Sequence, residues 1–505
     1  MDRRQFIAIA GSATALGLTA CSGSSEGSSP TPPPPAGPPW ATLAGQMQGT
    51  VLLPADAAYA LAAPVFNAVY DTTLAQAIVR CASASDVTLA LAFAHANNLA
   101  VTARSGGHGY TGNATTTGMV IDVGNMNAIT LGTGTATIGA GAKLVDVYDQ
   151  LSSQGVCIAS GSCPTIGIAG ITQGGGIGVV DRAYGLTCDS LVSAQVVLAD
   201  GSVVTCDATT HADLFWALRG GGGGNFGIVT SMTFNTFATR DLTSFFAEFA
   251  WPDAAKVLAA WQAWPLTLPD AVWSGLVLAT TGSSTASPVI QVSGMFIGSA
   301  SDLTPIWTQF LATAGATPTT QSMQTQAFHD AMLASCNGAT VSQCHLASET
   351  NDGQVGRASF VATSDFFNAA LPDAGIQALL GAVDAQQAAG EIIVIMDLMG
   401  GAIARVAPDA TAFVHRNALF SAQYYISGPV GVTPAQVAQA QAIVSGARMT
   451  MAPWSSGEAY QNYLDPALTD WQAAYYGANY ARLVQVKAAY DPTQVFKPAQ
   501  GIPPQ

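Results

Sequence analysis

A glycine-rich stretch between residues 161 and 178 constrains the fold of this chain more than any other segment. It reads GSCPTIGIAGITQGGGIG, so that glycine is interleaved with isoleucine and threonine. Flexible linkers combine glycine with polar residues, whereas this stretch is too apolar to stay in water. Because glycine has no Cβ, another segment or a ligand can approach such a backbone closely. The stretch therefore predicts a buried surface against which something packs.

A tight turn, Arg104-Ser105-Gly106-Gly107-His108, follows an apolar segment that is typical of a strand. Its two consecutive glycines permit a sharp turn, and successive N–H groups in such a turn can converge on an anion such as a pyrophosphate. The histidine at the tip would lie beside the bound group. On these residues alone, a β-hairpin with a surface histidine is an equally good interpretation.

Length and charge limit the classes of function. The chain has 505 residues, which is enough for about two domains. Its 16 basic and 31 acidic residues give a net charge of −15. That balance argues against binding to nucleic acid and against attraction to anionic lipid headgroups. It leaves a small-molecule ligand open.

The N-terminus resembles an export signal rather than part of the fold. Residues 1–20 carry Arg3-Arg4 and then an apolar run that is too short to span a bilayer. Leu-Thr-Ala before Cys21 is typical of a lipoprotein cleavage site, so we expect a lipid anchor at Cys21. Residues 21–39 are rich in Ser, Gly and Pro and predict a tether. The protein is thus expected in the periplasm or on the cell surface of a bacterium; an uncleaved anchor is the alternative.

Short strands alternate with helices over residues 71–240, which predicts an α/β or α+β domain. Strands are predicted at 77–81, 100–103, 119–123, 135–139 and 193–199, and helices at 83–98, 143–154 and 213–219. Asp200-Gly201 predicts the turn of a β-hairpin.

Four motifs in order resemble the FAD-linked oxidases of the vanillyl-alcohol-oxidase superfamily, and the berberine-bridge-enzyme-like branch fits best. The motifs are the turn at 104–108, CPTIG at 163–167, LRGGGGGNFGIVT at 218–230 and the closing segment at 475–496. The resemblance spans roughly residues 70–503. It implies an α+β, two-domain PCMH-type fold. An FAD-binding domain at 40–240 would precede a substrate domain at 241–452, an antiparallel sheet covered by helices, and a C-terminal segment at 453–505 would return to the FAD domain.

In the substrate domain, strands are expected at 288–297 and 391–400, and helices at 302–314, 373–387 and 434–447.

The resemblance also implies how FAD is held. The pyrophosphate would lie on the turn at 104–107, His108 would bond to the flavin 8α-methyl group, and Cys163 would bond to flavin C6. A buried structural thiol is the alternative for Cys163. The implied cofactor-binding residues are Arg104, Ser105, Gly106, Gly107, His108, Cys163, Ile166, Gly167, Gly170, Gly174, Gly175, Gly178, Gly227, Ile228 and Asn479.

Oxidation of an alcohol by a flavin requires a base near the hydroxyl proton. By resemblance, Tyr475 and Tyr476 stand where related oxidases carry catalytic tyrosines. Tyr110 matches a tyrosine beside the substrate, and Gln423 matches a polar position on the substrate-domain sheet. The alternatives are core aromatics for the pair at 475–476 and a solvated strand residue for Gln423.

The resulting hypothesis is an oxidase that transfers a hydride from an alcohol or sugar to flavin N5 and is reoxidised by O2. A dehydrogenase that passes electrons to a quinone or redox protein is the alternative, because Ile166, at the position that gates oxygen in relatives, does not decide between them. A non-catalytic envelope protein that binds ligands is a remote third.

The remaining cysteines, histidines and tryptophans leave smaller questions. Cys336 and Cys344 are close enough in sequence for a disulfide, although folding before export argues against one. The histidines show no metal-ligand spacing, so no metal site is predicted. Four tryptophans, at positions 251, 261, 264 and 273, are interpreted as core residues, with a sugar platform as the alternative.

Overall fold

The computed structural model describes residues 37–390 and 392–504. The export signal predicted at residues 1–20, the lipid anchor at Cys21 and most of the 21–39 tether lie outside the described residues. These assignments stay predictions, as do the domain boundaries near residues 240 and 452.

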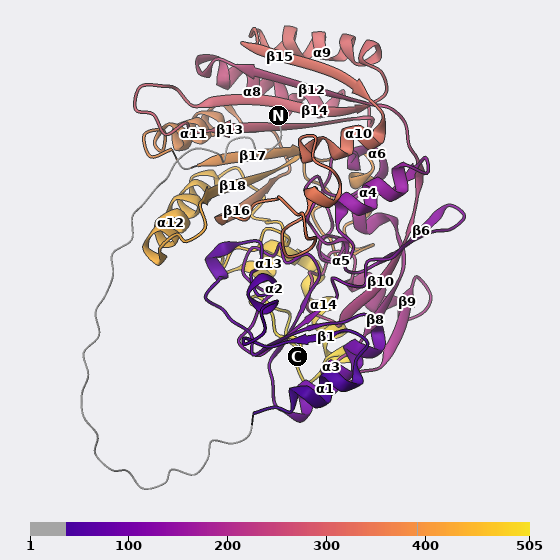
Figure 1. The fold of residues 1–505 in the computed structure, drawn as a ribbon. Coiled ribbons are helices and arrows are strands. Elements are labelled where there is room, and N and C mark those ends of the chain that lie inside the picture. Colours follow the sequence, from indigo (N-terminus) through magenta and orange to yellow (C-terminus); the bar gives the residue numbers. More distant parts are fainter. Residues whose placement is uncertain (1–36, 391, 505) are drawn as a thin grey trace, which may run out of the picture.

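The N-terminal half contains a four-stranded sheet with the order β1-β2-β4-β3 (Figure 1). Its strands are β1 Thr50–Leu52, β2 Ala77–Arg80, β3 Val101–Arg104 and β4 Met119–Asp122. β2 and β3 both run parallel to β4, so the chain between β2 and β3 must cross over the sheet. Helix α3 Ala84–Ala96 forms this crossover connection. The hydroxyl of Ser83 caps α3 by accepting the Asp86 N–H. Two short helices precede this unit, α1 Trp40–Gln46 and α2 Tyr59–Ala62.

A second, antiparallel sheet has the order β5-β6-β10-β8-β9. Its strands are β5 Ile129–Leu131, β6 Thr135–Gly139, β8 Leu191–Val197, β9 Val203–Asp207 and β10 Ile228–Asn235. The turn predicted at Asp200-Gly201 joins β8 to β9 and is confirmed, with Gly201 at a φ of +83°. Helices α4 Leu144–Ser152, α5 Ile168–Gln173, α6 Asp181–Tyr184 and α7 Ala212–Ala217 accompany it, and β7 Val156–Cys157 pairs with β11 Phe237–Ala238.

The third sheet has seven antiparallel strands in the order β15-β12-β14-β13-β17-β18-β16. They are β12 Leu242–Phe249, β13 Val272–Ala279, β14 Val289–Ile297, β15 Thr320–Gln326, β16 Ser359–Phe367, β17 Ile393–Leu398 and β18 Phe420–Gly428. Helices α8 Ala254–Ala263, α9 Ala300–Ala314, α11 Asp373–Asp384 and α12 Pro434–Met451 cover one face of this sheet (Figure 1). The expected helix-covered antiparallel sheet is confirmed.

The two faces of this sheet have different environments because side chains alternate along each strand. In β17, Val394 and Met396 belong to the apolar core beneath the helices. Ile393, Ile395 and Asp397 point the other way and line a cavity. Trp261 and Trp264 lie in the core, as predicted, whereas Trp273 lines the cavity.

The C-terminal segment returns to the first half of the molecule, as the resemblance implied. Helices α13 Trp471–Tyr476 and α14 Tyr480–Tyr490, yellow in Figure 1, lie among the elements from the start of the chain. The buried Lys487 amine pairs with Asp491 at 2.6 Å and donates to the Asn225 carbonyl at 2.6 Å. This buried pair ties α14 to the glycine-rich segment around residue 220.

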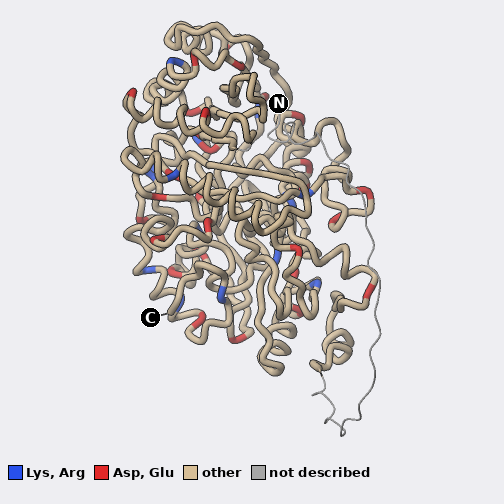
Figure 2. Tube along the Cα trace, turned by 90° about the vertical axis from the view of Figure 1, so that its left-hand side faces the viewer, with Lys and Arg blue, Asp and Glu red and all other residues tan. Residues whose placement is uncertain are grey.

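Charged side chains are sparse, and Lys and Arg are interspersed with Asp and Glu along the chain (Figure 2). None of the helices in the described residues combines the length and apolar character needed to cross a membrane. Within residues 37–390 and 392–504, no group of three or more His, Cys, Asp or Glu side chains is placed to hold a metal ion. Cys336 and Cys344, which follow α10 Phe328–Leu333, are joined in a disulfide.

Candidate active site

A cavity of about 700 Å³ lies between the open face of the seven-stranded sheet and the glycine-rich loops of the first half. Most of the sequence-predicted site residues line it. They are Arg104, Ser105, Gly106, Gly107, His108, Tyr110, Cys163, Ile166, Gly167, Gly170, Gly227, Ile228 and Gln423. Residues separated by more than 300 positions in sequence thus meet around one space.

Gly106 and Gly167 show why both loops need glycine. A Cβ on Gly106 would overlap the backbone nitrogen of Gly167, and a Cβ on Gly167 would overlap the Ser105 hydroxyl. That hydroxyl donates to the Ala140 carbonyl at 2.6 Å. The turn at 104–108 and the segment at 163–167 are therefore in direct backbone contact, and a side chain at either glycine would separate them.

His108 and Cys163 face the same cavity from these two loops. The His108 Nε2 atom hydrogen-bonds the buried Thr165 hydroxyl at 2.8 Å, and its ring stacks on Phe66 with centroids 4.0 Å apart. Cys163 is half-buried. No atom lies within 4 Å of a Cβ placed on Gly170 or Gly223, both of which line the cavity, so there is open space beside the backbone. The loops and the space beside them fit a bound FAD.

Three glycines predicted to bind the cofactor do not line the cavity. A Cβ on Gly174 would meet the Asn462 side chain, and one on Gly175 would meet the Phe413 ring. A Cβ on Gly178 would overlap the Ser160 carbonyl. The close approach predicted from this stretch is real, but at Gly174, Gly175 and Gly178 the partner is the protein itself.

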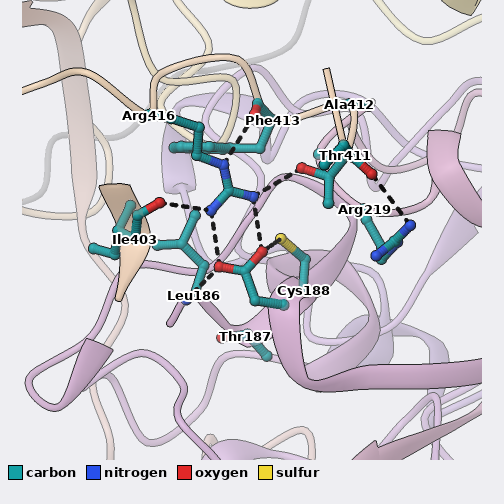
Figure 3. Close-up of polar contacts among 12 residues, drawn as sticks. Leu186, Thr187, Cys188, Arg219, Ile403, Thr411, Ala412, Phe413 and Arg416 are labelled. Carbon is teal, nitrogen blue, oxygen red and sulfur yellow. Dashed lines mark hydrogen bonds and ion pairs between the residues drawn. The ribbon is translucent and has the colours of Figure 1, made fainter. Parts of the chain in front are cut away.

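A buried ion pair between Arg416 and Asp189 stabilises this glycine-rich stretch (Figure 3). The Arg416 guanidinium makes two hydrogen bonds to Asp189, at 2.7 and 2.8 Å, and a third to the Thr411 hydroxyl. Next to Asp189, the Cys188 N–H donates to the Gly175 carbonyl at 2.9 Å. The pair thereby connects the segment before β18 to the glycine-rich stretch.

Tyr110 and Gln423, each predicted separately as a site residue, are in contact in the cavity wall. The Gln423 side-chain amide donates to the Tyr110 hydroxyl at 2.7 Å, and the Tyr110 ring stacks on Tyr463 with centroids 5.1 Å apart. Burial, and then the neighbouring Tyr463 and Tyr425, raise the pKa of Tyr110 well above its usual value. Tyr110 therefore stays protonated at neutral pH and can donate a hydrogen bond into the cavity.

The structure separates the other predicted catalytic residues from the cavity. Tyr475 and Tyr476 are buried in the hydrophobic core of the first half, and the Tyr475 hydroxyl accepts the Asp465 N–H at 2.8 Å. Asn479 donates to the carbonyls of Pro408 and Thr411. Tyr475 and Tyr476, predicted as catalytic, and Asn479, predicted to bind the cofactor, do not line the cavity. Their contacts attach the closing segment to the core, and their predicted roles stay predictions.

The sequence analysis missed several cavity residues, among them two tyrosines, an asparagine and an aspartate. Tyr460, Asn462 and Tyr463 precede α13, and Asp397 ends the cavity face of β17. The Tyr460 hydroxyl accepts the N–H groups of Gly176 and Ile177 and a bond from Asn462. The available signals were a carboxylate within the otherwise apolar IVIMDL strand and two tyrosines around a pair of amide side chains in AYQNY.

Asp397 is the single carboxylate among the described residues that line the cavity. It lies opposite Gly275 of β13, at which a Cβ would stand 3.6 Å from the Asp397 Oδ1 atom and 3.2 Å from the Trp273 indole. The indole thus lies over the glycine and next to the carboxylate. The Trp273 Nε1–H is buried and has no hydrogen-bond partner among the described residues.

Comparisons with known proteins agree with this arrangement. Residues 75–207 match the FAD binding domain family, and residues 459–503 match the family described as berberine and berberine like. An uncharacterized FAD-linked oxidoreductase of Bacillus subtilis, YgaK, is 33% identical over 85% of this chain and 91% of its own. The chitooligosaccharide oxidase of Gibberella zeae is 31% identical over 81% of this chain and 83% of its own. The solved structure of Physcomitrella patens BBE-like 1 superposes with a TM-score of 0.84 at 28% identity, over 92% of this chain and 99% of that one.

Proposed function

This chain belongs to the FAD-linked oxidoreductases of the berberine-bridge-enzyme-like family, and we propose that it oxidises a hydroxyl group of a saccharide with O2 as electron acceptor. The observation that carries the proposal is that His108, Cys163, Asp397, Tyr110 and Gln423 all line one cavity. One wall suits a tethered flavin, and the other supplies acid–base and hydrogen-bonding groups.

FAD would be held by the backbone of the turn at 104–107 and by bonds to His108 and Cys163. The contact between Gly106 and Gly167 supports this assignment, because it fixes the two attachment loops relative to each other. The hydrogen bond between the Thr165 hydroxyl and the His108 Nε2 atom orients the imidazole. When bound, FAD supplies the hydride acceptor.

Asp397 is the proposed acceptor of the hydroxyl proton. A carboxylate accepts a proton at neutral pH, whereas buried tyrosines such as Tyr110, whose pKa is raised, do not. Gln423 fixes the direction of the Tyr110 hydroxyl, which then orients the substrate. Tyr463, stacked on Tyr110, completes this wall.

A saccharide ring suits the part of the sheet face beside Asp397. The Trp273 indole offers an apolar platform there, and the adjacent Gly275 leaves room. The Trp273 N–H has no hydrogen-bond partner among the described residues, and a ring hydroxyl would provide one. The oxidase of Gibberella zeae is named for chitooligosaccharides, which supports the same class.

The test is reduction of the purified yellow protein without air by a panel of oligosaccharides, monosaccharides and aromatic alcohols. We expect bleaching by a saccharide, hydrogen peroxide when air is admitted, and flavin that stays with the acid-precipitated chain. Bleaching by aromatic alcohols alone contradicts the substrate class. Reoxidation by a quinone analogue but not by O2 contradicts the acceptor. A white precipitate with a yellow supernatant contradicts covalent attachment.

A further inference from the structure

A buried cluster of charges lies where the two attachment loops meet the seven-stranded-sheet half of the molecule. At its centre is Lys143, which directly precedes helix α4 and is 7% exposed. Its amine is 3.4 Å from the Ser105 carbonyl, 3.3 Å from the Gly141 carbonyl and 3.3 Å from the Glu349 carboxylate. The amine therefore contacts the His108 turn on one side and a residue of the distant half on the other.

The backbone next to Lys143 is hydrogen-bonded to the segment at 163–167, which carries Cys163. The Leu144 N–H donates to the Ile166 carbonyl at 3.0 Å, and the Val145 N–H donates to the Pro164 carbonyl at 2.9 Å. Lys143 itself forms a β-bridge with Gly167. The stretch from 143 to 145 thus holds the segment that carries Cys163 by its backbone and the turn that carries His108 by one side chain.

Glu349 and His345 complete the cluster from the other half. The two His345 nitrogens lie 3.4 Å from Glu349 and 3.1 Å from Asp146 of α4. Burial opposes protonation of His345, but its hydrogen bond to Asp146 and its ion-pair contact with Glu349 outweigh that effect and raise the pKa to about 9. Burial likewise opposes ionisation of Glu349, yet its contact with His345 and the charges of Lys143 and His108 hold its pKa below the usual value. The cluster thus brings two basic side chains, Lys143 and His345, against two acidic ones, Asp146 and Glu349.

The disulfide fixes the segment that delivers these side chains. His345 follows Cys344 directly, and both cysteines pack against Val145 of α4. The disulfide restrains the segment at 336–349 internally. Apolar contacts and ion pairs attach this segment to the start of α4.

We propose that Lys143 is a positioning residue that sets the spacing between the His108 turn and the Cys163 segment, and that Glu349 and His345 hold it in place across the two halves. The inference rests on the proposed function, since it concerns the two flavin bonds. Formation of each bond breaks one N–H or S–H bond of the protein and one C–H bond of the flavin. For each bond formed, the two hydrogens and their electrons would reduce the flavin, and O2 would then reoxidise it and leave as hydrogen peroxide.

The test compares Lys143→Met with Lys143→Arg, which keeps the charge, and with Lys256→Met, which removes an exposed ion pair to Asp253. The readout is the fraction of His108 and of Cys163 peptides that carry flavin by mass spectrometry, beside cooperative unfolding followed by circular dichroism. We expect Lys143→Met to lose at least half of the flavin at one of the two sites while still unfolding cooperatively. Lys143→Arg should restore it, and Lys256→Met should match the wild type.

Equal occupancy of both sites in Lys143→Met and the wild type overturns the inference. If Lys143→Met does not fold, Glu349→Gln provides the same comparison with a neutral side chain of the same shape, and normal occupancy there overturns it equally. Failure of the proposed function is distinguishable: a wild type that carries no covalent flavin contradicts that proposal, whereas a doubly attached wild type with unchanged variants contradicts only the role of Lys143.

Discussion

Two neighbouring stretches of the C-terminal segment each carry a pair of tyrosines, and the pairs have different environments. Tyr460 and Tyr463 line the cavity, whereas Tyr475 and Tyr476 are buried in the core of the first half. The stretches are in contact, since the Tyr475 hydroxyl accepts the N–H of Asp465, two residues after Tyr463. The second pair thus supports the loop that presents the first. Aromatic composition does not separate a cavity wall from its support; the contacts do.

The largest expected effect concerns two carboxylates, Asp397 on the cavity wall and Asp465 next to the buried tyrosine pair. Asp397→Asn removes the proposed proton acceptor and should slow flavin reduction by a saccharide by roughly a hundredfold or more, with flavin still bound. Asp465→Asn, the matched change beside the supporting pair, should leave that rate within a few-fold. The measurement is stopped-flow absorbance without air. Equal rates in Asp397→Asn and the wild type would remove Asp397 from the chemistry.

The tyrosine hydroxyls give a smaller kinetic contrast. Tyr463→Phe removes a hydroxyl from the cavity wall and should slow the same step by about tenfold, because it disturbs hydrogen bonding around the reacting group. Tyr475→Phe should change it little. If Tyr475→Phe slows flavin reduction as much as Tyr463→Phe does, the assignment of Tyr463 to the cavity wall and of Tyr475 to a supporting role is wrong.

Stability should show the opposite order. Tyr475→Phe leaves the buried Asp465 N–H without its acceptor and should lower the free energy of unfolding by about 1–2 kcal/mol. Tyr463→Phe, in the half-buried wall, should cost less. Urea unfolding followed by circular dichroism measures both, and a larger loss for Tyr463→Phe would contradict the assignment.

The last prediction concerns pH at the Lys143 cluster, which lies outside both stretches. His345 gains protonation on folding, since its pKa rises to about 9 from roughly 6.5 in an unfolded chain. Its stabilising contribution is therefore complete below about pH 6.5 and disappears as pH rises through 9. The charged groups that face it are Asp146 and Glu349, with Lys143 next to Glu349.

Wild type and His345→Gln should accordingly differ most in unfolding free energy near pH 6 and converge above pH 9. A difference that grows as the solution becomes more alkaline would show that His345 is not protonated in the fold.

Much of this architecture was predictable because its signals are local. The turn at 104–108, the Asp200-Gly201 hairpin and the strands β2, β3, β4, β6 and β8 each have a signature within a few residues. The position of Tyr475 and Gly174 outside the cavity lining has no such local signature. Whether a tyrosine faces a cavity, or whether a glycine is approached by Asn462 or by a ligand, depends on segments almost 300 positions away in sequence. A short stretch carries no information about those contacts.

The alternation along β17 has a consequence for how the substrate range can change. Ile393 and Ile395 point into the cavity, while their neighbours Val394 and Met396 anchor the covering helices. Substitutions at Ile393 and Ile395 can change the shape of the cavity, and so the substrates it admits, without disturbing the core beneath the helices. Single substitutions at these positions can therefore alter substrate specificity. Directed evolution of this chain should begin at those two isoleucines and leave the interlocked glycines alone.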